Sequence, residues 1–322
     1  MVAIPQFTDP TLEAADNALA ATQSRSRRGH LGMSQIGAPC DRALWYSFRW
    51  AAQPNFDAPT LKRFEDGHAT EAVVVARLKK VPGINLHEVD EHGEQFRFED
   101  FGGHFSGSCD GAVLGIVQAP KTWHILEVKA SEKWADLDKA RKTVGEKSAL
   151  LQWNATYYAQ AALYMHYAGI ERHYLVAASP GARKWTAVRT NADPVHAEVM
   201  RQRAERIIFS DTAPARIGDE TYFQCRWCDF APICHGSDRI DRIERNCRTC
   251  LHVSVERDGS WRCTRFDKVL GKVAQERGCS DQRYLPTLVP FEQIDAQEWG
   301  IVYRRPDGTE WVDRGPALDT AV

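Results

Sequence analysis

Apolar residues in the first third of the chain recur at intervals of three and four, which places them on one face of a helix. Pro59 suits a first helical turn, and Pro82 would end the helix that begins there. The pattern predicts helices over residues 11–21, 40–50 and 59–80. We expect the second and third of these helices to cover a sheet.

The period changes between residues 94 and 129, where short apolar or alternating runs are separated by glycines. Such runs are typical of β-strands. The predicted strands are residues 96–98, 105–107, 112–114 and 124–129, and we expect them to pair in antiparallel fashion.

Helical spacing returns over residues 150–167, and Gly169 suits the left-handed residue that ends many helices. Two further strands are predicted over residues 173–178 and 184–190, followed by a helix over 194–209. This order of elements indicates an α/β fold with a mixed sheet flanked by helices.

The last third of the chain is rich in cysteine and arginine, and two alternating runs around residues 306–309 predict a terminal hairpin. We therefore divide the chain into three parts. They are a flexible N-terminal arm (1–30), a main domain (31–238) and a small cysteine-rich metal-binding module (239–322).

Composition adds limits to this picture. The net charge of −2 gives no overall attraction to a polyanion, so nucleic-acid binding would need a local basic groove. No apolar run reaches the roughly 20 residues that span a bilayer, and the N-terminus lacks a secretory signal. We expect no membrane partner and a cytoplasmic location, where nine cysteines would serve metal sites in preference to disulfides.

Two carboxylates and a lysine form the first candidate site. Glu127 and Lys129 are two residues apart on a predicted strand, so their side chains leave the same face, and Asp110 precedes the neighbouring strand. Carboxylates that face one point repel each other, and Mg²⁺ or Mn²⁺ relieves this while activating a water molecule that Lys129 would orient. Taken alone, the pattern also fits a surface ion pair.

Three further residues accompany this site. His68 lies on the helix before the sheet and could complete a manganese site, although an ordinary half-buried histidine fits the position equally. Gln160 and Tyr164 are four residues apart and project from one helical face, either toward the site or within a tyrosine-rich packing stripe.

The motifs G-H-x-x-E, G-x-x-D-G, E-V-K and Q-x-x-x-Y occur in this order at residues 67–71, 107–111, 127–129 and 160–164. This series resembles the motifs of the RecB-like PD-(D/E)XK nucleases, although Cys109 stands where the nominal motif has proline. The resemblance implies a restriction-endonuclease-like core, a catalytic Lys129, and Gln160 and Tyr164 that support the lysine and contact DNA. The implied metal ligands are His68, Asp110, Glu127 and the backbone carbonyl of Val128.

A first set of four cysteines surrounds the main domain. Cys225, Cys228 and Cys234 form C-x-x-C-x5-C, and Cys40 is the candidate fourth ligand of a zinc ion or an iron–sulfur cluster. This arrangement is similar to that of AddB, the CRISPR-associated RecB-like nucleases and the eukaryotic mitochondrial single-strand exonucleases. The resemblance implies a structural 4Fe–4S cluster that ties the two ends of the nuclease domain together.

A second set of four cysteines lies in the C-terminal module: Cys247, Cys250, Cys263 and Cys279. We expect it to bind zinc, while His252 as a substitute ligand and an iron–sulfur cluster stay open. Arginines surround this set together with Trp261 and Phe266. Because acidic residues are interleaved with them, an ordinary solvated surface fits the pattern, and as functional roles DNA contact and protein docking explain it equally well. These arginines are Arg239, Arg242, Arg245, Arg248, Arg257, Arg262 and Arg265.

The motif order favours a single-strand-preferring, Mg²⁺- or Mn²⁺-dependent DNA exonuclease of recombination, repair or phage DNA processing. Its partners would be DNA and a recombination or helicase protein, in a bacterial or phage-infected cell. Two alternatives stay open: a non-catalytic DNA-binding or scaffolding subunit, and a structure- or site-specific endonuclease.

Overall fold

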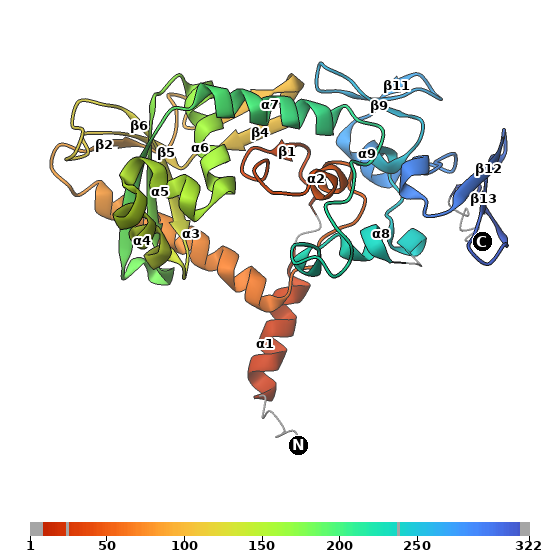
Figure 1. Ribbon diagram of the computed structural model, residues 1–322, viewed down its shortest axis with the longest axis horizontal. Helices are drawn as coiled ribbons and strands as arrows, with labels where there is room; N and C mark the ends of the chain where they lie inside the picture. The colour runs from red at the N-terminus through yellow and green to blue at the C-terminus, as the bar shows by residue number, and fades with distance from the viewer. Residues whose placement is uncertain (1–8, 24–25, 237–238, 316–322) are drawn as a thin grey trace.

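The largest sheet of the protein is a mixed, five-stranded sheet. The structure is a computed structural model that describes residues 9–23, 26–236 and 239–315. The strand order is β2-β5-β6-β7-β8; β6 and β7 run parallel and the other neighbours antiparallel (Figure 1). The strands are β2 (Asn85–His87), β5 (Gly111–Leu114), β6 (His124–Ala130), β7 (Arg172–Ala178) and β8 (Trp185–Asn191). The predicted mixed sheet is thus confirmed.

Helices cover both faces of this sheet. On one face, Val74 and Val75 of α3 (Ala58–Leu78) pack with Leu126 and Val128 of β6. The other face is covered by α4 (Trp134–Val144), α5 (Glu146–Trp153) and α6 (Ala155–Ala168). Because side chains alternate along a strand, Glu127 and Lys129 lie on the face opposite Leu126 and Val128. The two charged residues therefore face α6.

The expected continuous helix over residues 150–167 is wrong, because the chain breaks at Asn154. This residue is extended, and its side chain accepts hydrogen bonds from the backbone N–H groups of Thr156 and Tyr157, which caps α6. Gly169 ends α6 in the left-handed conformation, as predicted. The break allows α5 and α6 to take different directions across the sheet.

A second, three-stranded sheet has the order β1-β4-β3, with β1 (Leu31–Gly32), β4 (Phe105–Ser108) and β3 (Arg97–Asp100). The predicted strands over residues 96–98 and 105–107 are confirmed and pair antiparallel, but they lie outside the main sheet. A side chain at Gly107 would come within 2.8 Å of the Tyr164 hydroxyl. Glycine here leaves room for that tyrosine to approach the sheet.

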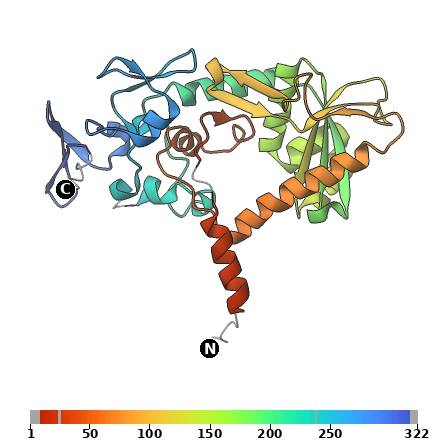
Figure 2. The same ribbon diagram turned by 180° about the vertical axis from the view of Figure 1, so that it is seen from behind.

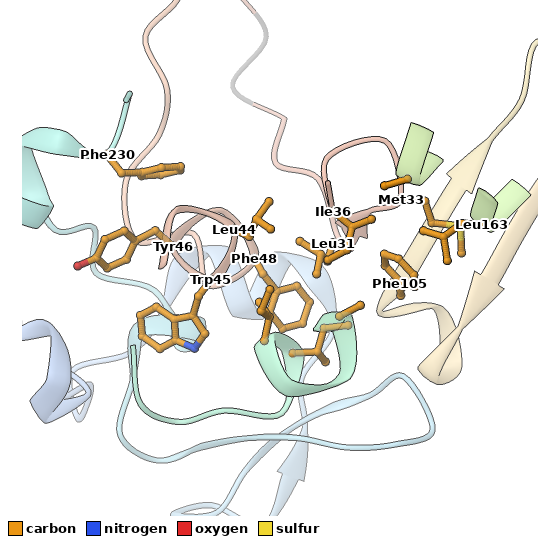
Figure 3. Close-up of a cluster of buried hydrophobic side chains, with 14 of the residues drawn as sticks. Leu31, Met33, Ile36, Leu44, Trp45, Tyr46, Phe48, Phe105, Leu163 and Phe230 are labelled. Atoms are coloured by element: carbon orange, nitrogen blue, oxygen red, sulfur yellow. The ribbon is translucent and has the colours of Figure 1, made fainter. Parts of the chain in front are cut away.

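The short helix α2 (Asp41–Phe48) lies at the centre of the molecule, between the main sheet and the C-terminal segment (Figures 1 and 2). Its side chains Leu44 and Phe48 lie beside Leu31 and Ile36, and Tyr46 points toward Phe230 (Figure 3). Two other predicted helices are confirmed as α1 (Pro10–Ala21) and α7 (Pro194–Ile208). No helix of the described ranges is long and apolar enough to cross a membrane.

After α7 the described part of the chain forms short strands and two short helices. The predicted hairpin is confirmed by β13 (Gly300–Arg304) and β14 (Glu310–Asp313). The other elements were not predicted: α8 (Ala231–His235), β9 (Val253–Val255), β10 (Trp261–Cys263), β11 (Lys268–Val269), α9 (Lys272–Arg277) and β12 (Glu292–Gln297). Ile243, Val253 and Trp261 belong to the same buried cluster as α2. The domain boundaries stay a prediction, and part of the proposed arm (1–8 and 24–25) lies outside the described residues.

Candidate active site

Strand pairing brings Asp110 next to Glu127 and Lys129. Asp110 directly precedes β5, whose first residue, Gly111, pairs with Leu126 of β6. The Asp110 carboxylate accepts a 2.7 Å hydrogen bond from the backbone N–H of Val128. A side chain at Gly111 would lie 2.5 Å from the His87 carbonyl oxygen, so this turn requires glycine. The predicted neighbouring strands are confirmed, and they fix where Asp110 lies.

Glu127 is the most enclosed member of this group, with 3% of its surface exposed. Its Oε1 accepts hydrogen bonds from Lys129 Nζ and, at 2.9 Å, from Gln160 Nε2. Gln160 Nε2 is also 3.1 Å from the Tyr164 hydroxyl. Glu127 Oε2 is buried without a hydrogen-bond partner among the described residues. One half of this carboxylate is therefore held in place, and the other half is left unsatisfied.

Burial shifts the acid–base behaviour of all three charged groups. It raises the pKa of Glu127 to about 7, with Asp110 adding to the increase and Lys129 opposing it. Burial also raises the pKa of Asp110 against the opposing effects of Lys129 and the Val128 N–H. For Lys129, burial lowers the pKa, but the two carboxylates outweigh it and raise the pKa overall. One ammonium thus serves two buried carboxylates, and the raised pKa values of both show that burial disfavours their charged forms.

The donor set suits a small divalent cation. Asp110 and Glu127 offer hard oxygen ligands, and Mg²⁺ is commonly held by one or two carboxylates with the remaining positions left to water and phosphate. Across the described ranges, no group of three or more His, Cys, Asp or Glu side chains is arranged as a ready metal site. Two carboxylates, one of them with an unsatisfied oxygen, nevertheless meet the ordinary requirement for magnesium.

The helix α3 carries the two ionisable residues of the G-H-x-x-E motif, His68 and Glu71. His68 is exposed and makes no hydrogen bond or ion pair that the described residues show, so its role as a ligand stays a prediction. Glu71, one turn further along, is half-buried, and its pKa is raised by burial and by the charge of Asp110. The charges of His68 and Lys129 lower the Glu71 pKa. Glu71 therefore interacts electrostatically with Asp110 and Lys129, and the G-H-x-x-E motif alone assigned it no role.

Two aromatic side chains, Tyr157 and Trp153, lie next to each other, with Tyr157 beside Lys129. Lys129 Nζ lies 5.1 Å from the ring centroid of Tyr157, and that ring lies 5.5 Å from the ring of Trp153. Trp153 lines a groove of about 520 Å³ together with Lys133 and Lys139. Sequence reasoning missed these residues because Trp153 ends α5 at the unexpected break.

Each cysteine quartet lines a pocket of its own. Cys40, Cys225, Cys228 and Cys234 line one pocket, and Cys247, Cys250, Cys263 and Cys279 line the other together with His252. Among the described residues, the side chains of neither set have the arrangement of a metal-binding site. Cys109 lies outside both pockets and is fully buried, which raises its pKa to about 12. It packs as a small core residue, as predicted.

The arginines near the second quartet mostly have partners within the protein. Arg248 is buried, and four others pair with carboxylates: Arg245 with Asp313, Arg257 with Glu205, Arg262 with Asp267 and Arg265 with Asp281. The side chain of Arg239 lies outside the described set. This pairing favours a structural role for the cluster over a basic DNA-binding face.

No family model matches the chain, and no curated relative does either. Several solved structures are similar to it. SSO0001 is 16% identical with a TM-score of 0.40, over 71% of this chain and 98% of that one. An alkaline exonuclease from Laribacter hongkongensis is 16% identical with a TM-score of 0.39, over 59% and 90%. A phage-related exonuclease from Haemophilus somnus is 16% identical with a TM-score of 0.32, over 45% and 69%. These are similarities at low identity and assign no activity to this chain.

Proposed function

We propose that this protein is a divalent-metal-dependent deoxyribonuclease of the PD-(D/E)XK type. The observation that carries the proposal is the buried Glu127, whose Oε2 has no partner within the described residues, beside Asp110 and Lys129 on adjacent strands. Such a carboxylate pair suits a hard cation better than a purely structural ion pair, which would leave no oxygen unsatisfied.

Each residue has a role in this proposal. A bound Mg²⁺ or Mn²⁺ would polarise the scissile phosphate and lower the pKa of a water molecule. Asp110 and Glu127 would hold the cation, with the Val128 carbonyl and His68 as further ligands. Lys129 donates to Glu127 in this structure. Once the carboxylates have a second positive partner, its ammonium can instead donate to the attacking water or to a phosphate oxygen.

Gln160 orients Glu127 by donating a hydrogen bond to its carboxylate, and the Tyr164 hydroxyl accepts a second hydrogen bond from the same amide group. A Gln160→Leu variant removes the only neutral donor to Glu127 that the described residues show. We expect its kcat/KM to fall about 10- to 100-fold, the usual effect of losing a group that orients a metal ligand. Half-maximal activity should require more Mn²⁺. An unchanged rate and Mn²⁺ requirement would contradict this role. Gln202→Leu, on the exposed surface of α7, is the matched control.

The groove beside Lys129 supports single-stranded DNA as the substrate. Aromatic side chains stack on unpaired bases, and lysines follow the phosphate backbone. Trp153 would supply the first kind of contact, and Lys133 and Lys139 would supply the second, while the acidic side chain of Asp136 also lines the groove. A local groove of this kind is what a chain with a net charge of −2 needs in order to bind DNA.

Cleavage of linear and circular single strands tests the exonuclease against its alternatives. With Mg²⁺ or Mn²⁺ present, we expect linear single strands to be degraded from their ends and circular single strands to resist, because an exonuclease needs an end. Opening of the circle would identify an endonuclease. Binding of either substrate without cleavage would favour a scaffolding subunit.

We also propose that the first quartet holds a structural 4Fe–4S cluster. Cys40 caps the N-terminus of α2, and the other three cysteines lie beyond α7, so the pocket joins the two ends of the proposed nuclease domain. The backbone N–H of Ala43 donates to Cys40 Sγ at 3.4 Å, a contact that stabilises a thiolate. The physiological setting that fits this activity is cytoplasmic recombination, repair or phage DNA processing, together with a recombination or helicase partner.

A further inference from the structure

The second quartet lies in a part of the chain that the nuclease proposal does not use. Its four cysteines come from three separate segments that meet at one pocket. Cys247 and Cys250 lie at the short helical turn η5 (Cys247–Thr249), Cys263 ends β10, and Cys279 follows α9. Convergence from three segments is a property of the fold and not of the C-x-x-C spacing alone.

Strand pairing and loop contacts hold these segments together. Cys263 pairs with Val253, three residues after Cys250, in the antiparallel ladder of β10 with β9. Gly278 packs against the backbone of Asn246, which brings the following Cys279 toward Cys247. Two sulfurs already make polar contacts: Cys250 Sγ accepts the His252 N–H at 3.5 Å, and the Cys247 thiol donates to the Ala274 carbonyl at 3.4 Å.

The segment around the pocket has little regular structure to stabilise it. The strands β9 and β10 have three residues each, and β11 has two. Sheets this short are marginal by themselves, and small units of this kind are commonly stabilised by a metal ion or by disulfides. None of the four cysteines forms a disulfide. The segment therefore has four convergent thiols and no covalent cross-link.

We propose that Cys247, Cys250, Cys263 and Cys279 bind a structural Zn²⁺ ion. Four thiolates match the tetrahedral, sulfur-rich coordination of zinc, and a complete protein shell leaves no position for substrate. To bind the ion, the sulfurs must lie closer together than they do in this structure, and the Cys247 thiol must give up its proton and its contact with Ala274. His252 also lines the pocket, and its backbone N–H donates to Cys250 Sγ.

A metal ion bound at the second quartet would also stabilise the position of α2 through Arg248. Arg248 lies between the first two ligands, 3.7 Å from the Trp50 ring and 4.3 Å from the Trp261 ring. Its guanidinium donates to the carbonyls of Gly29 and Phe48, both at 2.9 Å. A metal ion at Cys247 and Cys250 fixes this turn and thereby the C-terminal end of α2. Cys40, in the other pocket, caps the opposite end of the same helix.

Metal analysis of the purified full-length chain tests the proposal. We expect about one zinc ion per chain, lost in Cys263→Ser and Cys279→Ser. Cys40→Ser, in the first quartet, and Cys109→Ala, outside both, should keep the zinc, as should His252→Ala. The proposal would be overturned if the wild-type chain contained no zinc or if Cys263→Ser kept its zinc. It would also be overturned if Cys263→Ser and Cys279→Ser lost iron and not zinc.

Cobalt substitution keeps the test decisive if the variants of the second quartet fail to fold. After chelation, Co²⁺ titrated into Cys40→Ser, in which the first quartet is incomplete, should still produce the absorption bands of a tetrahedral four-thiolate site. A spectrum without those bands would overturn the assignment. Zinc content does not depend on DNA cleavage, so failure of the nuclease proposal and failure of the zinc proposal are distinguishable.

Discussion

Replacing Lys129 by methionine should lower the rate of DNA cleavage by about two to three orders of magnitude, since the ammonium stabilises charge that develops in the transition state. Methionine keeps much of the side-chain length and removes the charge. The effect should appear in single-turnover rates at saturating Mn²⁺, because Lys129 is proposed to act on water or phosphate and not to hold the cation.

The matched control is Lys79→Met, which removes another lysine that pairs with a glutamate, at the exposed position beside Glu88. It should cleave DNA at the wild-type rate. Equal rates for the two variants would remove Lys129 from the reaction and favour the reading of Glu127 and Lys129 as a structural ion pair.

Replacing Arg248 by methionine should lower the free energy of unfolding by about 3 kcal/mol, because three acceptors lose their donor at about 1–3 kcal/mol each and the buried guanidinium's own desolvation cost offsets part of that loss. Arg248 is 3% exposed and donates to Gly29, Phe48 and Gln275, each at 2.9 Å. Its position between two tryptophan rings adds cation–π attraction that methionine cannot supply. Denaturant unfolding, monitored by tryptophan fluorescence, would measure the change.

Arg257→Met provides the comparison, because Arg257 is also an arginine over an aromatic ring with a polar partner. Its side chain is 72% exposed, and it pairs with Glu205 at 2.8 Å. Exposed pairs contribute little, so this variant should lose no more than about 1 kcal/mol. Similar losses for both variants would mean that the buried position of Arg248 does not anchor α2.

Strands β3 to β8 and most helices of the main domain follow from the sequence because their apolar spacing is local, whereas β1 and β2, with two and three residues, carry no recognisable pattern. Strands β5 to β8 each carry a clear run bounded by turn residues, and α3 begins and ends at prolines or close to them. The break at Asn154 does not follow in the same way. Asparagine is tolerated within a helix, and its capping role appears only when its side chain meets the N–H groups of Thr156 and Tyr157.

The residues of the candidate active site also fall into those that local spacing predicts and those that only tertiary packing brings together. Asp110, Glu127 and Lys129 could be paired because strand periodicity fixes which residues share a face. Glu71 and Trp153 could not, because their approach depends on how α3 and α5 cross the sheet. The charge pattern of the C-terminal segment left the role of its arginines open for a related reason. A sequence shows that Arg245 and Arg265 are basic but not that Asp313 and Asp281 lie beside them.

The divalent-metal dependence of DNA cleavage, measured for the wild-type chain and Asp110→Asn side by side, tests the central claim most directly. Asparagine keeps the shape of the side chain and removes the charge that would bind the cation. We predict no cleavage by the wild type in EDTA, full activity once Mg²⁺ or Mn²⁺ is restored, and a loss of about 100-fold or more in the variant with either metal. Cleavage by the wild type in EDTA, or equal metal-dependent cleavage by Asp110→Asn, would contradict a metal site at Asp110 and Glu127.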